Sequence, residues 1–93
     1  MASKNRTPYV RVLAVHDPAG VISEYVVLER LRFSDDDGFH AAARAEVERL
    51  RGKYGLPRGD LSLFEGSARS EESFFRMFLN LRRSPETRRG TPG

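Results

Sequence analysis

The hydrophobic pattern at positions 9–33 predicts two adjacent β-strands that are apolar on both faces. The first runs from about Tyr9 to His16 and the second from about Val21 to Phe33. Apolar residues occupy consecutive positions in both runs, so neither face of the predicted sheet is left polar. One face must line the hydrophobic core, and the other needs a cover or a partner.

The residues between these strands predict a tight turn. In Asp17-Pro18-Ala19-Gly20 the Asp side chain can cap its own backbone, Pro presets φ and Gly supplies a left-handed position. Two apolar runs joined by so short a turn indicate an antiparallel hairpin.

After Phe33 the period of the pattern becomes helical. Ser34 is the expected N-cap, and the three acidic residues that follow it suit the positive end of a helix dipole. Apolar residues then recur on one face as far as Tyr54. Gly55 is placed to end the helix and Pro57 blocks its continuation.

The last third of the chain predicts a short strand and a second helix. Leu61–Phe64 is the strand, closed by Gly66, and Ser70 is expected to cap a helix that Pro85 stops.

The second predicted helix is apolar on more than one face. Phe74, Phe78 and Leu81 form one stripe, whereas Phe75 and Leu79 lie well off it. A helix that is apolar nearly all round is either buried or docks a partner. We therefore expect Phe75 and Leu79 to serve self-association, as a symmetric homodimer.

These elements predict an α+β fold of order β-β-α-β-α. We expect an antiparallel three-stranded sheet with two helices packed mainly on one face. The 93 residues allow one domain, assigned to positions 9–83 between flexible basic tails at 1–8 and 84–93.

Composition narrows the classes of function. The chain has no cysteine, which excludes disulfides, thiolate metal sites and a cysteine nucleophile. It also has no apolar run of a signal peptide or a membrane span. We expect a cytoplasmic protein that does not enter the membrane.

The net charge of +3 suggests nucleic acid, but its distribution weakens that interpretation. Positions 9–81 hold 10 of the 16 Lys and Arg residues and 12 of the 13 Asp and Glu residues, which leaves a predicted fold of about −2. A domain that grips phosphates usually carries its positive charge on the folded surface. We expect any nucleic-acid binding to be weak and to depend on the tails.

The chain shows no convincing catalytic or metal motif. The acidic run before Gly38 lacks the spacing of a calcium loop, and His16 and His40 have no ligand spacing. His16 followed by Asp17 borders a turn in which Asp is the expected residue. We predict no enzymatic activity, no cofactor, no metal and no small-molecule ligand.

One face of the predicted hairpin combines aliphatic, aromatic and basic side chains. Its candidate partner-binding residues are Tyr9, Arg11, Leu13, Val26, Leu28, Arg30 and Arg32. This composition suits a protein interface, and Arg with aromatic residues on a sheet also suits single-stranded nucleic acid. Alternatively, the second helix covers the face and the Arg stems extend past it.

Positions 9–54 loosely resemble the small N-terminal arm-binding domains of phage-type integrases. There too a small sheet is followed by a helix that begins after an aromatic residue and a polar cap, here Phe33 and Ser34. The resemblance implies DNA binding through basic sheet residues. This chain departs from that pattern because its predicted domain is net acidic and its sheet is mostly aliphatic, and we assign no family.

The function that the sequence favours is a small non-enzymatic interaction module, or a regulator or inhibitor. It would bind a protein partner, or another copy of itself, through the apolar and Arg-bearing sheet face or through the second helix. The alternative is a nucleic-acid-binding protein that uses the sheet arginines and the basic tails.

Overall fold

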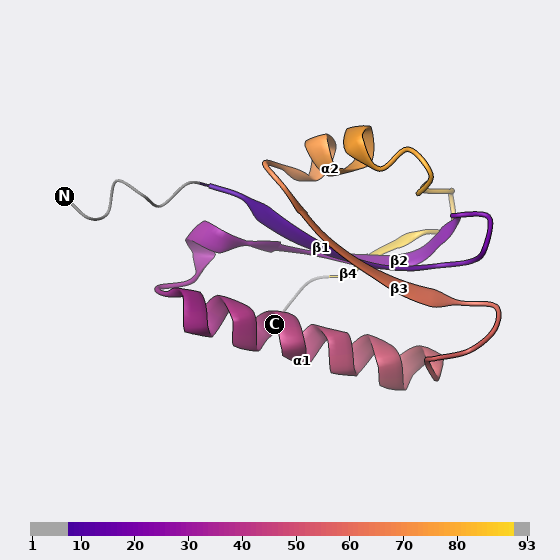
Figure 1. Cartoon of the computed structure of the whole chain (residues 1–93), viewed down its shortest axis with the longest axis horizontal. Helices are drawn as coiled ribbons and strands as arrows, with labels where there is room; N and C mark the ends of the chain where they lie inside the picture. Colours follow the sequence, from indigo (N-terminus) through magenta and orange to yellow (C-terminus); the bar gives the residue numbers. More distant parts are fainter. Residues whose placement is uncertain (1–7, 91–93) are drawn as a thin grey trace.

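The structure, a computed structural model, describes residues 8–90 as a four-stranded sheet between two helices (Figure 1). The elements are β1 (Val10–His16), β2 (Ile22–Glu29), a 3-10 turn (Arg30–Arg32), α1 (Asp36–Tyr54), β3 (Ser62–Ala68), α2 (Glu71–Met77) and β4 (Arg88–Gly90).

The sheet has the strand order β3-β1-β2-β4. β1 is central and pairs antiparallel with both β2 and β3, whereas β4 pairs in parallel with β2. The α+β class is confirmed, but the expected three-stranded antiparallel sheet is wrong by this fourth, parallel strand. β4 lies inside the segment 84–93 that we assigned to a tail. Residues 1–7 and 91–93 of the predicted tails lie outside the described residues.

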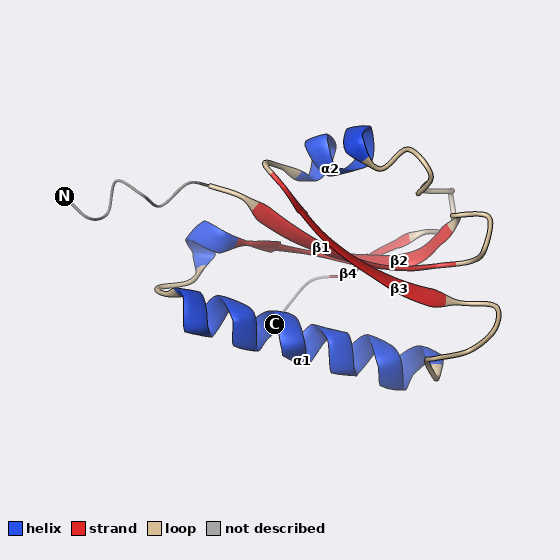
Figure 2. Cartoon of the chain, in the orientation of Figure 1, coloured by secondary structure: helices blue, strands red, loops and turns tan. Residues whose placement is uncertain are grey.

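The helices lie on opposite faces of the sheet, one layer each (Figure 2). On one face α1 buries Phe39 and Leu50 against Leu13, Val15 and Val26. On the other, α2 and the turn after it bury a second cluster, whose members are Val10, Val12, Ala14, Ile22, Tyr25, Val27, Phe74 and Leu81. The prediction that both helices pack mainly on one face is therefore wrong. A sheet that is apolar on both sides needs a cover on each.

A β-bulge near the hairpin turn reassigns one apolar residue. His16 pairs with Ile22 and Val15 with Glu24, so Ser23 is an extra residue in β2. The bulge turns Ile22 toward the α2 layer, whereas Glu24 faces α1 together with Val26 and Leu28. Uninterrupted alternation along the strand would have placed Ile22 and Glu24 on the same face.

The helix ends follow local signals closely. α1 is capped by Asp35, whose side chain accepts from the backbone N–H of Gly38, one residue later than the predicted Ser34. Gly55 ends the helix with φ 65°, as predicted. Ser70 caps α2 by accepting from the Ser73 N–H, also as predicted. Within residues 8–90, no helix has the length and apolarity needed to cross a bilayer.

The hairpin turn is held by the chain segment that follows α2. The Ile22 N–H donates to the Arg82 carbonyl at 2.9 Å, and the Arg82 N–H donates to the Gly20 carbonyl at 2.8 Å. Gly20 has φ 89°, and a Cβ added to it would overlap the carbonyl oxygen of Asn80. The turn therefore needs glycine for both its conformation and its close approach.

We predict that Gly20→Ala lowers the free energy of unfolding by at least about 2 kcal/mol, because it combines a strained positive φ with a backbone clash. Gly52→Ala is the matched control, since Gly52 is an exposed residue of α1 with no neighbouring atom near its missing Cβ. That change should stabilise the protein by about 0.5–1 kcal/mol. Urea unfolding followed by circular dichroism measures both, and equal effects would contradict the account of the turn.

Candidate functional site

Three residues of the predicted docking face are core residues. Leu13, Val26 and Leu28 are 0%, 0% and 1% exposed and lie beneath α1. This sheet face is therefore covered, by the first helix and not by the second. These three side chains offer no surface to a partner.

Two arginines of the same face pack around Phe39, a fully buried residue of α1. The guanidinium carbons of Arg11 and Arg30 lie 5.6 and 5.9 Å from the centre of its ring. Tyr9 meets the ring edge-on, with 5.5 Å between centroids. Tyr9, Arg11 and Arg30 thus belong to one intramolecular cluster that holds the start of α1 to the sheet.

Arg30 and Arg32 lie close in sequence but differ in environment. Arg30 is only 8% exposed; its Nε donates to the Asp36 carboxylate at 2.7 Å and its Nη1 to the Phe33 carbonyl at 3.0 Å. Arg32 is exposed and lies 3.7 Å from the Glu29 carboxylate. Of the two, only Arg32 is accessible to a partner.

The two candidate residues near α2 also differ. Phe75 is half-buried, because it packs edge-on against Tyr25 at 5.2 Å between centroids and the Arg83 guanidinium lies 4.1 Å above its ring. Leu79 is 76% exposed, and Met77 beside it is 60% exposed. Phe75 is thus largely engaged within the chain, while Leu79 remains on the surface.

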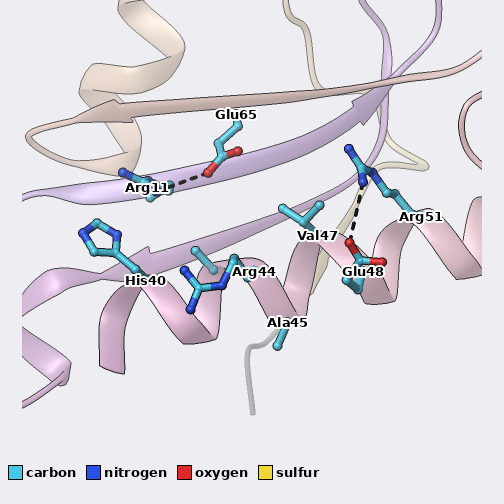
Figure 3. Close-up of a pocket in the computed structure, with 9 residues that line it drawn as sticks. Arg11, His40, Arg44, Ala45, Val47, Glu48, Arg51 and Glu65 are labelled. Carbon is cyan, nitrogen blue, oxygen red and sulfur yellow. Dashed lines mark hydrogen bonds and ion pairs between the residues drawn. The ribbon is translucent and has the colours of Figure 1, made fainter. Parts of the chain in front are cut away.

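A groove of about 600 Å³ lies between α1 and the strands β1 and β3 (Figure 3). Ala43, Ala45 and Val47 form its apolar part. Its charged and polar lining consists of Arg11, His40, Arg44, Glu48, Arg51 and Glu65. Figure 3 shows most of the labelled α1 side chains on one side of the groove and the Arg11–Glu65 pair of the strands on the other, with Ala45 pointing away from the strands.

The charges of the groove have both signs and are mostly paired. Arg11 Nη1 lies 3.2 Å from the Glu65 carboxylate, and Arg51 Nη1 lies 3.6 Å from that of Glu48. Arg44 is exposed and has no ion pair among the residues that the structure describes. The groove therefore presents one cation that is available to a ligand.

The sequence pattern did not single out this groove. Arg44, Glu48 and Arg51 are four and three positions apart, so a helix places them on one face. A charged face is also the ordinary solvent face of an amphipathic helix, so the spacing alone was uninformative. The groove further depends on β3 lying beside β1, and nothing in the local sequence specifies that order.

A buried carboxylate ties β2 to the last turns of α1. Glu24, 3% exposed, accepts from Lys53 at 2.7 Å, from the Tyr54 hydroxyl at 2.8 Å and from Arg49 at 3.4 Å. Burial by itself raises the pKa of Glu24, but these donors together outweigh it and lower that pKa below its usual value. Burial and the nearby Glu24 carboxylate raise the pKa of Tyr54.

A second ionic tie joins α2 to β2 and β4. The Glu71 carboxylate accepts from Arg89 at 2.9 Å and from the Tyr25 hydroxyl at 2.6 Å. The Arg89 guanidinium lowers the pKa of Glu71 against the opposing effect of burial. Charged hydrogen bonds thus fix both helices to β2, one on each face of the sheet.

Both histidines and Asp17 have partners within the fold. His16 Nδ1 lies 2.9 Å from the backbone carbonyl of Asp17, whose carboxylate accepts from the Val21 N–H and closes the turn. His40 contacts the Phe39 ring. Across the described part of the chain, no three His, Cys, Asp or Glu side chains are grouped so that they could hold a metal ion.

Comparisons of the chain with protein-family models, with curated proteins and with solved structures found no match. No family or relative therefore assigns a function to the groove or to the strands beside it.

We predict that Glu24→Gln destabilises the protein by about 2 kcal/mol at pH 7, because charged hydrogen bonds to a buried group are lost. The folded-state pKa of Glu24 lies below its unfolded value, so its contribution is complete above about pH 4.5 and is lost as the pH falls through the folded pKa. The difference between wild type and variant should therefore shrink at low pH. Unfolding measured from pH 3 to pH 7 tests this, and a constant difference would argue against it.

We further predict that Arg30 stabilises the fold and that Arg44 does not. Arg30→Ala should cost about 1–3 kcal/mol, because it removes two hydrogen bonds and the packing against Phe39. Arg44→Ala should change stability by less than about 0.5 kcal/mol, as expected for an exposed, unpaired side chain. Thermal unfolding decides this, and a large loss for Arg44→Ala would show that the residue has a structural role.

Proposed function

We propose that this protein is a non-enzymatic interaction module of the cytoplasm that binds a protein partner by adding an extended segment to the outer edge of β3. The observation that carries the proposal is that β3 is an edge strand lying beside the groove of α1. In this mode of recognition main-chain hydrogen bonds supply affinity, and pockets for alternate side chains supply specificity.

The backbone register identifies the free groups of β3. The Arg30 N–H donates to the Tyr9 carbonyl, so Tyr9 and every second residue after it in β1 bond to β2, and the residues between them bond to β3. Val12 faces Gly66, which assigns the even-numbered residues of β3 to β1. The outward N–H and C=O groups are then those of Leu63, Glu65 and Ser67.

The β3 edge carries few of the features that prevent strand addition. β3 contains neither Pro nor Lys, and its one charged side chain, Glu65, pairs with Arg11 of the neighbouring strand. The opposite edge is formed by β4, which is only three residues long. β3 therefore offers a partner the longer run of free main-chain groups.

Side-chain contacts in the groove support the same proposal. Alternate side chains of an added strand would point to the α1 face of the sheet and enter the groove. Arg44 lines the groove and offers a guanidinium to a carboxylate or carbonyl of the partner.

Nucleic-acid binding is the alternative, and a different region supports it. Residues 69–90 hold six arginines and three glutamates, so basic charge gathers around α2 and β4. The sheet arginines lend it less support, because Arg11 and Arg30 are ion-paired and packed against Phe39. The location and the salt dependence of binding separate the two functions.

The test is a selection of binding peptides from a random display library, followed by mapping of the backbone amides by NMR. We expect selected peptides to perturb the amides of Leu63, Glu65 and Ser67 and to bind in an extended form. Ser67→Pro removes an outward N–H and should weaken binding by about tenfold, the value of one main-chain hydrogen bond. Ser67→Thr keeps the N–H and is the matched control.

Two results would contradict the proposal. One is a set of binders that leaves the β3 amides unperturbed. The other is tight, steeply salt-dependent binding of single-stranded nucleic acid that maps to residues 69–90, which would favour the alternative function.

A further inference from the structure

We infer that the strand added to β3 is the β3 strand of a second copy of this chain, so that the protein forms a symmetric dimer through this edge. The inference rests on the proposed function, because it names the partner of the same edge. It replaces the sheet face and α2 as the surface of self-association.

The symmetry of an antiparallel strand pair suits two identical chains. Two β3 strands that pair antiparallel are related by a two-fold axis perpendicular to the sheet, so each copy contributes the same surface. The free groups of Leu63, Glu65 and Ser67 in one copy would then pair with free groups of these residues in the other. A rotation about an axis perpendicular to the sheet does not exchange the two faces of the sheet. Both α1 helices therefore lie on the same side of one continuous sheet.

The two grooves join between these helices. Each groove lies under β3, between that strand and α1 (Figure 3), so the pairing of the β3 edges brings the grooves together across the axis. The half-buried Val47 lines each groove and would lose further surface to solvent. Burial of apolar surface adds to the main-chain hydrogen bonds.

The charges of the groove are self-complementary. α1 presents Arg44, Glu48 and Arg51 in succession along the groove. The α1 of the second copy runs in the opposite direction, so Arg44 of one copy can face Glu48 of the other, and the two-fold axis repeats that contact. A groove of mixed sign suits a copy of itself better than it suits a strongly acidic or basic ligand.

Sedimentation of the full chain from micromolar to near-millimolar concentration tests the inference. We expect a reversible monomer–dimer equilibrium. Arg44→Glu and Glu48→Arg should each weaken dimerisation by about tenfold or more, because one reversal turns two attractive contacts into repulsive ones. The double variant R44E/E48R should restore dimerisation to near the wild-type constant.

The matched control is Arg76→Glu. Arg76 lies on α2, on the other face of the sheet, and is paired with Glu72 at 3.5 Å with the i,i+4 spacing that also separates Arg44 from Glu48. It should leave the dimer constant unchanged. Circular dichroism confirms that each variant is folded, and Ser67→Pro should give a folded monomer. If Ser67→Pro does not fold, the charge reversals at the exposed positions still test the inference.

Wild-type protein that stays monomeric throughout would overturn the inference. So would a dimer that is insensitive to Arg44→Glu, or one that R44E/E48R fails to restore. The proposed function is tested separately. If the protein is a monomer and peptides bind its β3 edge, the proposed function is supported and the dimer inference fails. A monomer without edge-binding peptides would remove both.

Discussion

The burial of β1 on both faces is the constraint on which the rest of the structure depends. Its four consecutive residues Val12–Val15 are 0% exposed, although a strand in a small domain usually keeps one face in water. Each face therefore requires a helix, and the chain supplies a long one and a short one. Both are used on the faces, so neither covers the outer edge of β3. The free edge follows from the way the core is closed.

The elements with strong local signals were predictable. The hairpin turn, the glycine that ends α1 and the Ser70 cap all act within a few residues, and the structure confirms them. The placement of the helices was not predictable, because two apolar faces of a sheet do not indicate which helix covers which face. β4 was missed for a physical reason as well: Arg88–Gly90 has no apolar pattern, and its position depends on distant contacts such as Arg89 with Glu71.

For the candidate site residues, too, local sequence patterns were not enough to predict the environment. An apolar side chain such as Leu13 or Val26 looks alike in a core and in an interface, so the sequence could not assign it to α1. Arg11 and Arg30 on a sheet suggested ligand binding, whereas a buried aromatic ring, Phe39, accounts for both. The groove and the free edge depend on strand order and on side chains from separate elements, which no local pattern contains.

The ionic ties are distributed unequally across the sheet, and this bears on how the β3 edge can be used. Glu24 and Glu71 fix the two helices to β2, next to β4, whereas beside β3 a groove separates the strand from α1. A strand that adds to β3 therefore meets an edge whose core is already closed, and binding requires no movement of the apolar layers. In the proposed binding mode, affinity would come from main-chain hydrogen bonds and a few groove side chains, led by Arg44. Recognition of this kind depends on an extended shape and on matching charges more than on a deep apolar pocket.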